Sequence, residues 1–291
     1  VYINGATSLP DGYYDWWVVA IDSAGKSTNS ADSEYFGVDL SPPSIDHSSP
    51  LTVIDENSTA TIKAVFDDGA SGVNWGQLHY RRAGSGGGFV TEDLYNAQSN
   101  SVNISGSDIK AEGLEYYIDS EDNIGNYNKW PKDKAFQSVK VRTEGSVTTA
   151  GNLNLAGGVD STNYIFFSIP FDVGNGIGAF KAMMDPANEG PDEFKYRLYA
   201  YNNGWQENPS SLTMGNGYFF IFDPDKYSDF LPIQFDFGQG VSTATDPPYK
   251  VNVTPGQWKF FGLPYNFNVP LSNVYTESGA SLNDAGSIYT W

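Results

Sequence analysis

Residues 10–25 read PDGYYDWWVVAIDSAG, and residues 113–126 read GLEYYIDSEDNIGN. Five positions correspond at a constant separation of 100 residues: Trp16, Val18, Ala20, Asp22 and Gly25 match Tyr116, Ile118, Ser120, Asp122 and Gly125. The first four alternate with period two, so each set is expected on one face of a β-strand. The aspartate and glycine predict a turn in which the carboxylate accepts backbone N–H groups and glycine takes a positive φ. A repeat of this length with short strands predicts immunoglobulin-like β-sandwiches.

Three stretches of the chain resemble known bacterial modules. LPDGYYDWWVVAIDSAGKS (9–27) with YFGVDLSPP (35–43) resembles the last strands of bacterial fibronectin type III-like modules. ATIKAVFDDGASGV, QLHYRRAGSGGGF and GLEYYIDSEDNIGN, within 60–126, resemble a related immunoglobulin-like module of bacterial exported proteins. FFSIPF (166–171), GNGYFFIF (215–222) and FFGLPY (260–265) are similar to β-rich modules near the C-terminal ends of type IX-secreted surface proteins. These resemblances imply extracellular spacers, stalks or binding platforms at the bacterial cell surface.

The sequence therefore predicts an all-β protein of tandem immunoglobulin-like/fibronectin type III-like β-sandwiches, followed by a C-terminal β-rich domain. Residues 1–41 are interpreted as the C-terminal part of a truncated module, and residues 42–143 as a complete sandwich. Residues 150–291 are interpreted as a β-rich module truncated at its C-terminus. Within it, strands are expected at 164–169, 196–201, 218–222, 233–237, 249–253 and 258–263, with a short Ala/Met segment at 179–184.

Composition argues against several functions. The chain has no cysteine and two histidines, His47 and His79, so thiol chemistry is excluded and few general bases are available. Gly/Ser-rich residues around Ser85 fit a hairpin loop better than a nucleophile elbow. The net charge of −19 argues against nucleic-acid binding. The longest apolar stretch, 164–171, is too short to cross a bilayer. We therefore expect no catalytic site and no membrane insertion.

Three groups of residues remain as candidate sites. Acidic and amide side chains in two turns could bind Ca²⁺, although Asx turns also explain them; they are Asp67, Asp68, Asp119, Asp122 and Asn123. Sugar rings could stack on Trp75, Trp130 and Trp205, although core packing is the commoner role of tryptophan. Trp17, Val19 and Ile21 place apolar groups on a second strand face, which indicates either that a neighbouring module or chain covers that face or that the pattern is a local irregularity.

Together these features predict a non-catalytic structural or adhesive segment of a large secreted or cell-surface bacterial protein, such as a filament or stalk subunit. Its expected partners are neighbouring modules, copies of itself and glycans. Two alternatives stay open: accessory modules of a secreted peptidase or glycosidase, and a carbohydrate-binding region. No cofactor is expected, and Ca²⁺ is the one ion that the acidic turns could bind.

Overall fold

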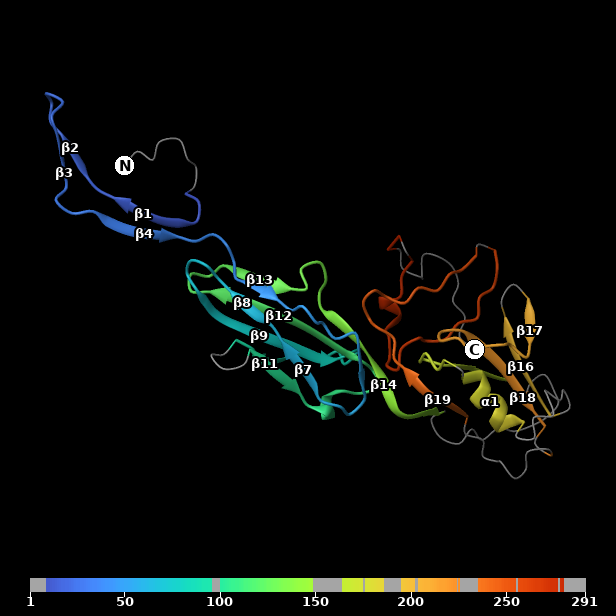
Figure 1. Ribbon diagram of the computed structural model, residues 1–291. Helices are drawn as coiled ribbons and strands as arrows, with labels where there is room; N and C mark the ends of the chain where they lie inside the picture. Colours follow the sequence, from blue (N-terminus) through green and yellow to red (C-terminus); the bar gives the residue numbers. More distant parts are fainter. Residues whose placement is uncertain are drawn as a thin grey trace.

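The computed structural model describes residues 9–95, 100–148, 164–174, 176–185, 195–201, 204–223, 225, 235–254, 256–276 and 278–279. Strands dominate these residues, and the one α-helix among them is short, so the all-β prediction is confirmed. The strands form three groups along an elongated chain (Figure 1). The N-terminal hairpins lie at one end, a sandwich lies in the middle, and a mixed module lies at the other end (Figure 1).

The N-terminal unit consists of two strand pairs. β1 (Gly12–Trp16) pairs with β4 (Glu34–Val38), and β2 (Val19–Ile21) pairs with β3 (Ser27–Asn29), both antiparallel. The expected single strand through Trp16, Val18 and Ala20 is therefore interrupted between Trp16 and Val19. No other described strand pairs with either hairpin. Large apolar side chains consequently remain exposed on both faces of this unit.

The middle unit is a sandwich of two layers. One layer contains β9 (Val73–Arg82), β10 (Val90–Asp93), β12 (Leu114–Asp122), β13 (Tyr127–Trp130), β14 (Gln137–Thr148) and β6 (Val53–Asp55). The other contains the pairs β5 (Ser44–Asp46) with β8 (Val65–Asp67), and β7 (Ala60–Lys63) with β11 (Ser101–Ile104). Alternate residues of these strands, among them Ile62, Leu78 and Ile118, are fully buried between the layers, as period-two patterning requires. A 3-10 helix, Gly106–Asp108, connects β11 toward β12.

The C-terminal unit packs one sheet against a helix. The sheet runs in the order β15 (Ile165–Ser168), β18 (Gly217–Phe222), β16 (Tyr196–Tyr201), β17 (Trp205–Glu207). The helix α1 (Gly176–Met184) buries Ile177, Phe180 and Met184, which recur at helical spacing. All six residues of β18 are buried, because the central strand of the sheet is covered on both faces.

One strand joins the two larger units. β14 pairs with β12 and β6 inside the sandwich, and its C-terminal half pairs with β19 (Asp236–Val241) of the C-terminal unit. Val147 of β14 belongs to the C-terminal core together with Phe237 of β19. β14 thus continues without a break from one hydrophobic core into the next (Figure 1).

Several strand predictions for the C-terminal unit need correction. β15, β16 and β18 lie where they were expected, and α1 includes the Ala/Met segment. Residues 235–237 of the expected 233–237 strand are described, and β19 extends from there to Val241. The strands expected at 249–253 and 258–263 are absent, apart from an isolated bridge between Phe261 and Asn216. A 3-10 helix, Leu271–Asn273, follows. No helix among the described residues is long and apolar enough to cross a membrane.

Candidate functional site

Three carboxylates meet where the N-terminal unit joins the sandwich. Asp39 follows β4, Asp68 follows β8, and Asp122 ends β12. One oxygen of each carboxylate lies within 4.8 Å of the others. No described lysine, arginine or histidine forms an ion pair with any of the three. The cluster therefore concentrates negative charge at a point where a hard cation would find oxygen ligands.

Backbone amides hold two of these carboxylates in place. Asp39 accepts hydrogen bonds from the N–H of Ser41 at 3.1 Å and of Ser71 at 2.9 Å. Asp68 accepts one from the N–H of Gly72 at 2.6 Å. The loop of residues 68–72 is thereby tied to the first residue after β4, so the cluster also fastens the N-terminal hairpins to the sandwich.

Asp39 and Asp122 are both buried, and Asp122 is the deeper of the two, with no exposed surface. Its Oδ1 accepts the N–H groups of Ile124 and Asn126, each at 2.9 Å, and its Oδ2 accepts the Asn126 amide at 2.7 Å. Burial acts to raise the pKa of Asp122, but the hydrogen bonds from Asn126 and Ile124 outweigh it and hold that pKa below its ordinary value. The carboxylate is therefore charged at neutral pH.

The five acidic-turn residues proposed from the sequence do not form one site. Asp68 and Asp122 come together, and the amide of Asn123 lies beside them, donating to the carbonyls of Ser71 and Gly72. Asp67 is exposed in β8 and does not belong to the cluster. Sequence reasoning missed Asp39, because it lies in the linker after β4, some 30 residues before Asp68.

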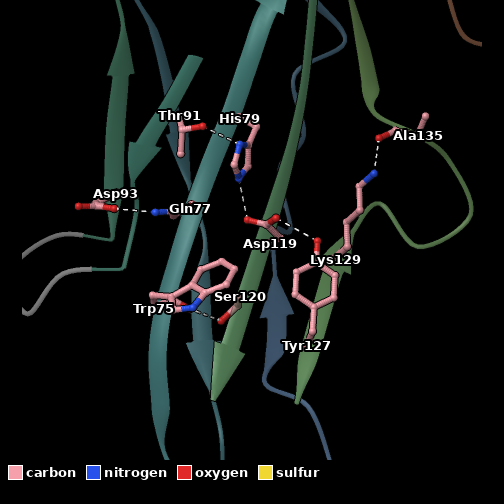
Figure 2. A network of polar contacts seen from close by, with 10 residues as sticks. All are labelled: Trp75, Gln77, His79, Thr91, Asp93, Asp119, Ser120, Tyr127, Lys129 and Ala135. Atoms are coloured by element: carbon pink, nitrogen blue, oxygen red, sulfur yellow. Dashed lines mark hydrogen bonds and ion pairs between the residues drawn. The ribbon is translucent and has the colours of Figure 1, made fainter. Parts of the chain in front are cut away.

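Asp119 belongs to a different network, on the outer face of the large sheet (Figure 2). It accepts hydrogen bonds from His79 Nε2 at 2.8 Å and from the Tyr127 hydroxyl at 2.9 Å. The other ring nitrogen of His79 lies 2.9 Å from the hydroxyl of Thr91. The network joins strands β9, β10, β12 and β13 side by side, which is how polar pairs stabilise a sheet face.

The order hydroxyl, imidazole, carboxylate in Thr91, His79 and Asp119 has the connectivity of a nucleophile, a base and an orienting acid. The ring of Tyr117 lies parallel to the His79 ring at 4.4 Å, so one face of the imidazole is covered. The second histidine, His47, bonds the Lys63 carbonyl at 2.6 Å and the Tyr116 hydroxyl at 2.8 Å. Burial lowers the pKa of His47. Both histidines thus link strands or loops of the sandwich.

The three candidate sugar-stacking tryptophans occupy different environments. Trp130 packs on the sandwich core, where its ring stacks on Tyr116 and meets His47 edge-on at 4.6 Å. Trp75 is half-buried beside Tyr127 on the outer sheet face. Trp205 is 58% exposed on β17. Of the three, Trp205 therefore presents the largest exposed fraction to a ligand.

The candidate interface residues are exposed. Trp17 is 57% exposed, Val19 43% and Ile21 69%. Trp16 and Val18 are also exposed, whereas their counterparts Tyr116 and Ile118 are fully buried in the sandwich. The same strand pattern is thus covered in one unit and open in the other.

No protein-family model matches the chain, and no curated protein matches it significantly. The resemblance to fibronectin type III-like, immunoglobulin-like and type IX-secreted modules therefore stays a prediction from the residues quoted above.

Proposed function

We propose that this chain is a non-catalytic structural segment of a secreted or cell-surface protein, and that it assembles through its N-terminal hairpins. The observation that carries this proposal is the open apolar surface of those hairpins. Trp17, Val19 and Ile21 expose large side chains, whereas the unit that repeats this pattern buries Tyr116 and Ile118 completely. Exposed apolar groups gathered in this way are typical of protein–protein contacts.

The way in which the units are joined supports a mechanical role for the chain. β14 runs through both larger units, and hydrogen bonds tie it to the segment that follows β19. Val141 N–H donates to the Ser242 hydroxyl at 2.8 Å, and Thr245 N–H donates to the Ser138 hydroxyl at 2.8 Å. A shared strand with side-chain bonds across the boundary favours a stiff rod over two freely jointed modules.

We propose a second copy of this chain as the partner, because no other described strand pairs with the outer edges of β1 and β4, and such edges can pair with a β-strand of another chain. Calcium at the Asp39, Asp68 and Asp122 cluster would stiffen the same end of the molecule. The residues do not favour catalysis as a second function, because Tyr117 covers one face of the His79 imidazole and His47 is bonded to Tyr116 inside the sandwich.

Sedimentation velocity over a wide concentration range tests the proposal. We expect concentration-dependent association of the chain, weakened by Trp17→Lys and by Ile21→Lys. Trp258→Lys is the matched control, since Trp258 is 64% exposed in the C-terminal unit, away from the hairpins. A chain that stays monomeric throughout, or association that survives Trp17→Lys unchanged, would overturn the proposal.

A further inference from the structure

A pocket of about 220 Å³ opens beside the hairpin of β16 and β17 in the C-terminal unit. Its wall is formed by residues of that hairpin, by the loop 209–217 and by Lys259. Because one water molecule in the liquid takes about 30 Å³, this volume corresponds to about seven waters, which suits a ligand of the size of one sugar ring. This pocket is separate from the acidic cluster and from the His79 network, which lie in the sandwich.

The pocket is lined with uncharged hydrogen-bonding side chains, namely Gln206, Ser210, Ser211, Thr213 and Asn216. None of these side chains makes a hydrogen bond to another described residue. Each therefore keeps its donors and acceptors for water or a ligand. Among the described residues of the lining, Lys259 is the one that carries a charge.

Aromatic rings supply the other part of the wall. Tyr201 lines the pocket, and its ring is held edge-on by Trp205 at 5.3 Å and by Phe260 at 5.3 Å. Trp205 itself stacks on Phe260 at 5.9 Å and stays 58% exposed. Trp205 lies outside the pocket lining, and its contact with Tyr201 fixes a residue of the wall, so a ligand that touches Tyr201 loses little entropy in ordering that side chain.

The backbone of the pocket loop is fixed as well. Thr213 N–H donates to the Tyr218 hydroxyl at 2.5 Å, and the Tyr249 hydroxyl donates to the Met214 carbonyl at 2.8 Å. Gly215 takes φ of +74°, and a Cβ there would lie 2.9 Å from the Tyr249 ring. The polar groups are thus held by a loop that is already shaped before a ligand arrives.

From this lining we infer that the pocket binds one saccharide residue. An apolar ligand would leave the amides and hydroxyls unpaired, at a cost for each. A phosphate would need more positive charge than one lysine supplies. A cyclic sugar offers hydroxyl donors and acceptors around its rim and C–H faces that pack on aromatic rings. Lys259 would favour a sugar that carries a carboxylate over its neutral counterpart.

The test uses the whole chain and five methyl glycosides: glucoside, galactoside, mannoside, N-acetylglucosaminide and glucuronide. Saturation-transfer NMR and calorimetry should show saturable binding of at least one of them at millimolar concentration. Gln206→Ala and Asn216→Ala should each weaken that binding about 2- to 10-fold, as expected for one lost neutral hydrogen bond. Gln257→Ala is the matched control, because Gln257 is exposed and lies outside the pocket.

Comparison of Trp205→Ala with Trp258→Ala tests whether the Trp205 indole contributes to glycoside binding. Weaker binding in the first variant alone is expected, since Trp205 supports Tyr201 in the pocket wall. Absence of binding by all five glycosides at tens of millimolar would overturn the inference. Binding that the Gln206→Ala and Asn216→Ala variants leave unchanged would overturn it equally. Neither result bears on association through the N-terminal hairpins, so the two proposals fail separately.

Discussion

Asp22 and Asp122, one hundred residues apart, hold the same turn in two different units. Asp22 Oδ1 accepts the N–H groups of Ala24 and Lys26, and Asp122 Oδ1 accepts those of Ile124 and Asn126, all at 2.9 Å. Gly25 and Gly125 both take positive φ in these turns. The strand register repeats too, since Ala20 faces Thr28 as Ser120 faces Asn128. The internal repeat of the sequence is therefore a structural repeat.

Removal of the two carboxylates should have unequal effects, because Asp122 is buried and Asp22 is exposed. We expect Asp122→Ala to lower the free energy of unfolding of the sandwich by about 3 kcal/mol, since several charge-assisted bonds disappear. Asp22→Ala should leave the main transition in place and lose only local amide protection at Ala24 and Lys26. Urea unfolding and hydrogen exchange measure the two effects. Equal destabilisation by both variants would contradict the assignment.

The depressed pKa of Asp122 gives a pH dependence of stability. A carboxyl whose pKa is lower in the folded state contributes stability that is fully present above its unfolded pKa. That contribution should fade as the pH falls below the ordinary value of 3.8 and toward the lower folded pKa. Thermal melts from pH 6 to pH 2 should show a steeper acid loss for the native chain than for Asp122→Asn. Parallel curves for the two proteins would show that Asp122 does not cause the loss.

Calcium should stabilise the sandwich through the cluster of Asp39, Asp68 and Asp122, because a divalent cation would offset three close negative charges. We expect millimolar CaCl₂ to raise the melting temperature by about 3 °C or more relative to EDTA. Sodium chloride of equal ionic strength controls for general screening. Asp68→Asn should remove the effect. No heat in a calorimetric titration with millimolar Ca²⁺ would exclude the site.

Glu115 joins the sandwich to the C-terminal unit, because it pairs with Arg81 at 2.7 Å and accepts the Thr245 hydroxyl at 2.7 Å. Glu115→Ala should destabilise the protein by about 3 kcal/mol, because it removes one charge of a largely buried ion pair and leaves Arg81 without its partner. Asp55→Ala is the control; its pair with Arg142 is exposed, so its loss should cost less than about 1 kcal/mol. Urea unfolding would contradict the prediction if the two variants lost the same stability.

The sequence predicted best where local chemistry decides the structure. The Asp22 and Asp122 turns follow from an aspartate, a glycine and a short strand on either side, all visible in the residues. β16 and β18 were expected for the same reason, since their aromatic runs are bounded by turn residues. Contacts between distant segments were harder: Asp39 joins Asp68 and Asp122 only because β4 ends beside their loops.

The wrong strand predictions share a cause. Residues 249–253 and 258–263 have strand-like composition, but a strand also needs a partner edge, which composition cannot supply. Tyr249 instead bonds the Tyr265 hydroxyl through its N–H and the Met214 carbonyl through its own hydroxyl.

The continuity of β14 has a mechanical consequence. When the two larger units are pulled apart along the chain, β14 carries the force, because its residues belong to both hydrophobic cores. The bonds from β14 to β6 and β19 lie across the strand, so such a pull loads them together in shear and does not peel them singly. The boundary between the units therefore resists extension, because several hydrogen bonds must break at the same time.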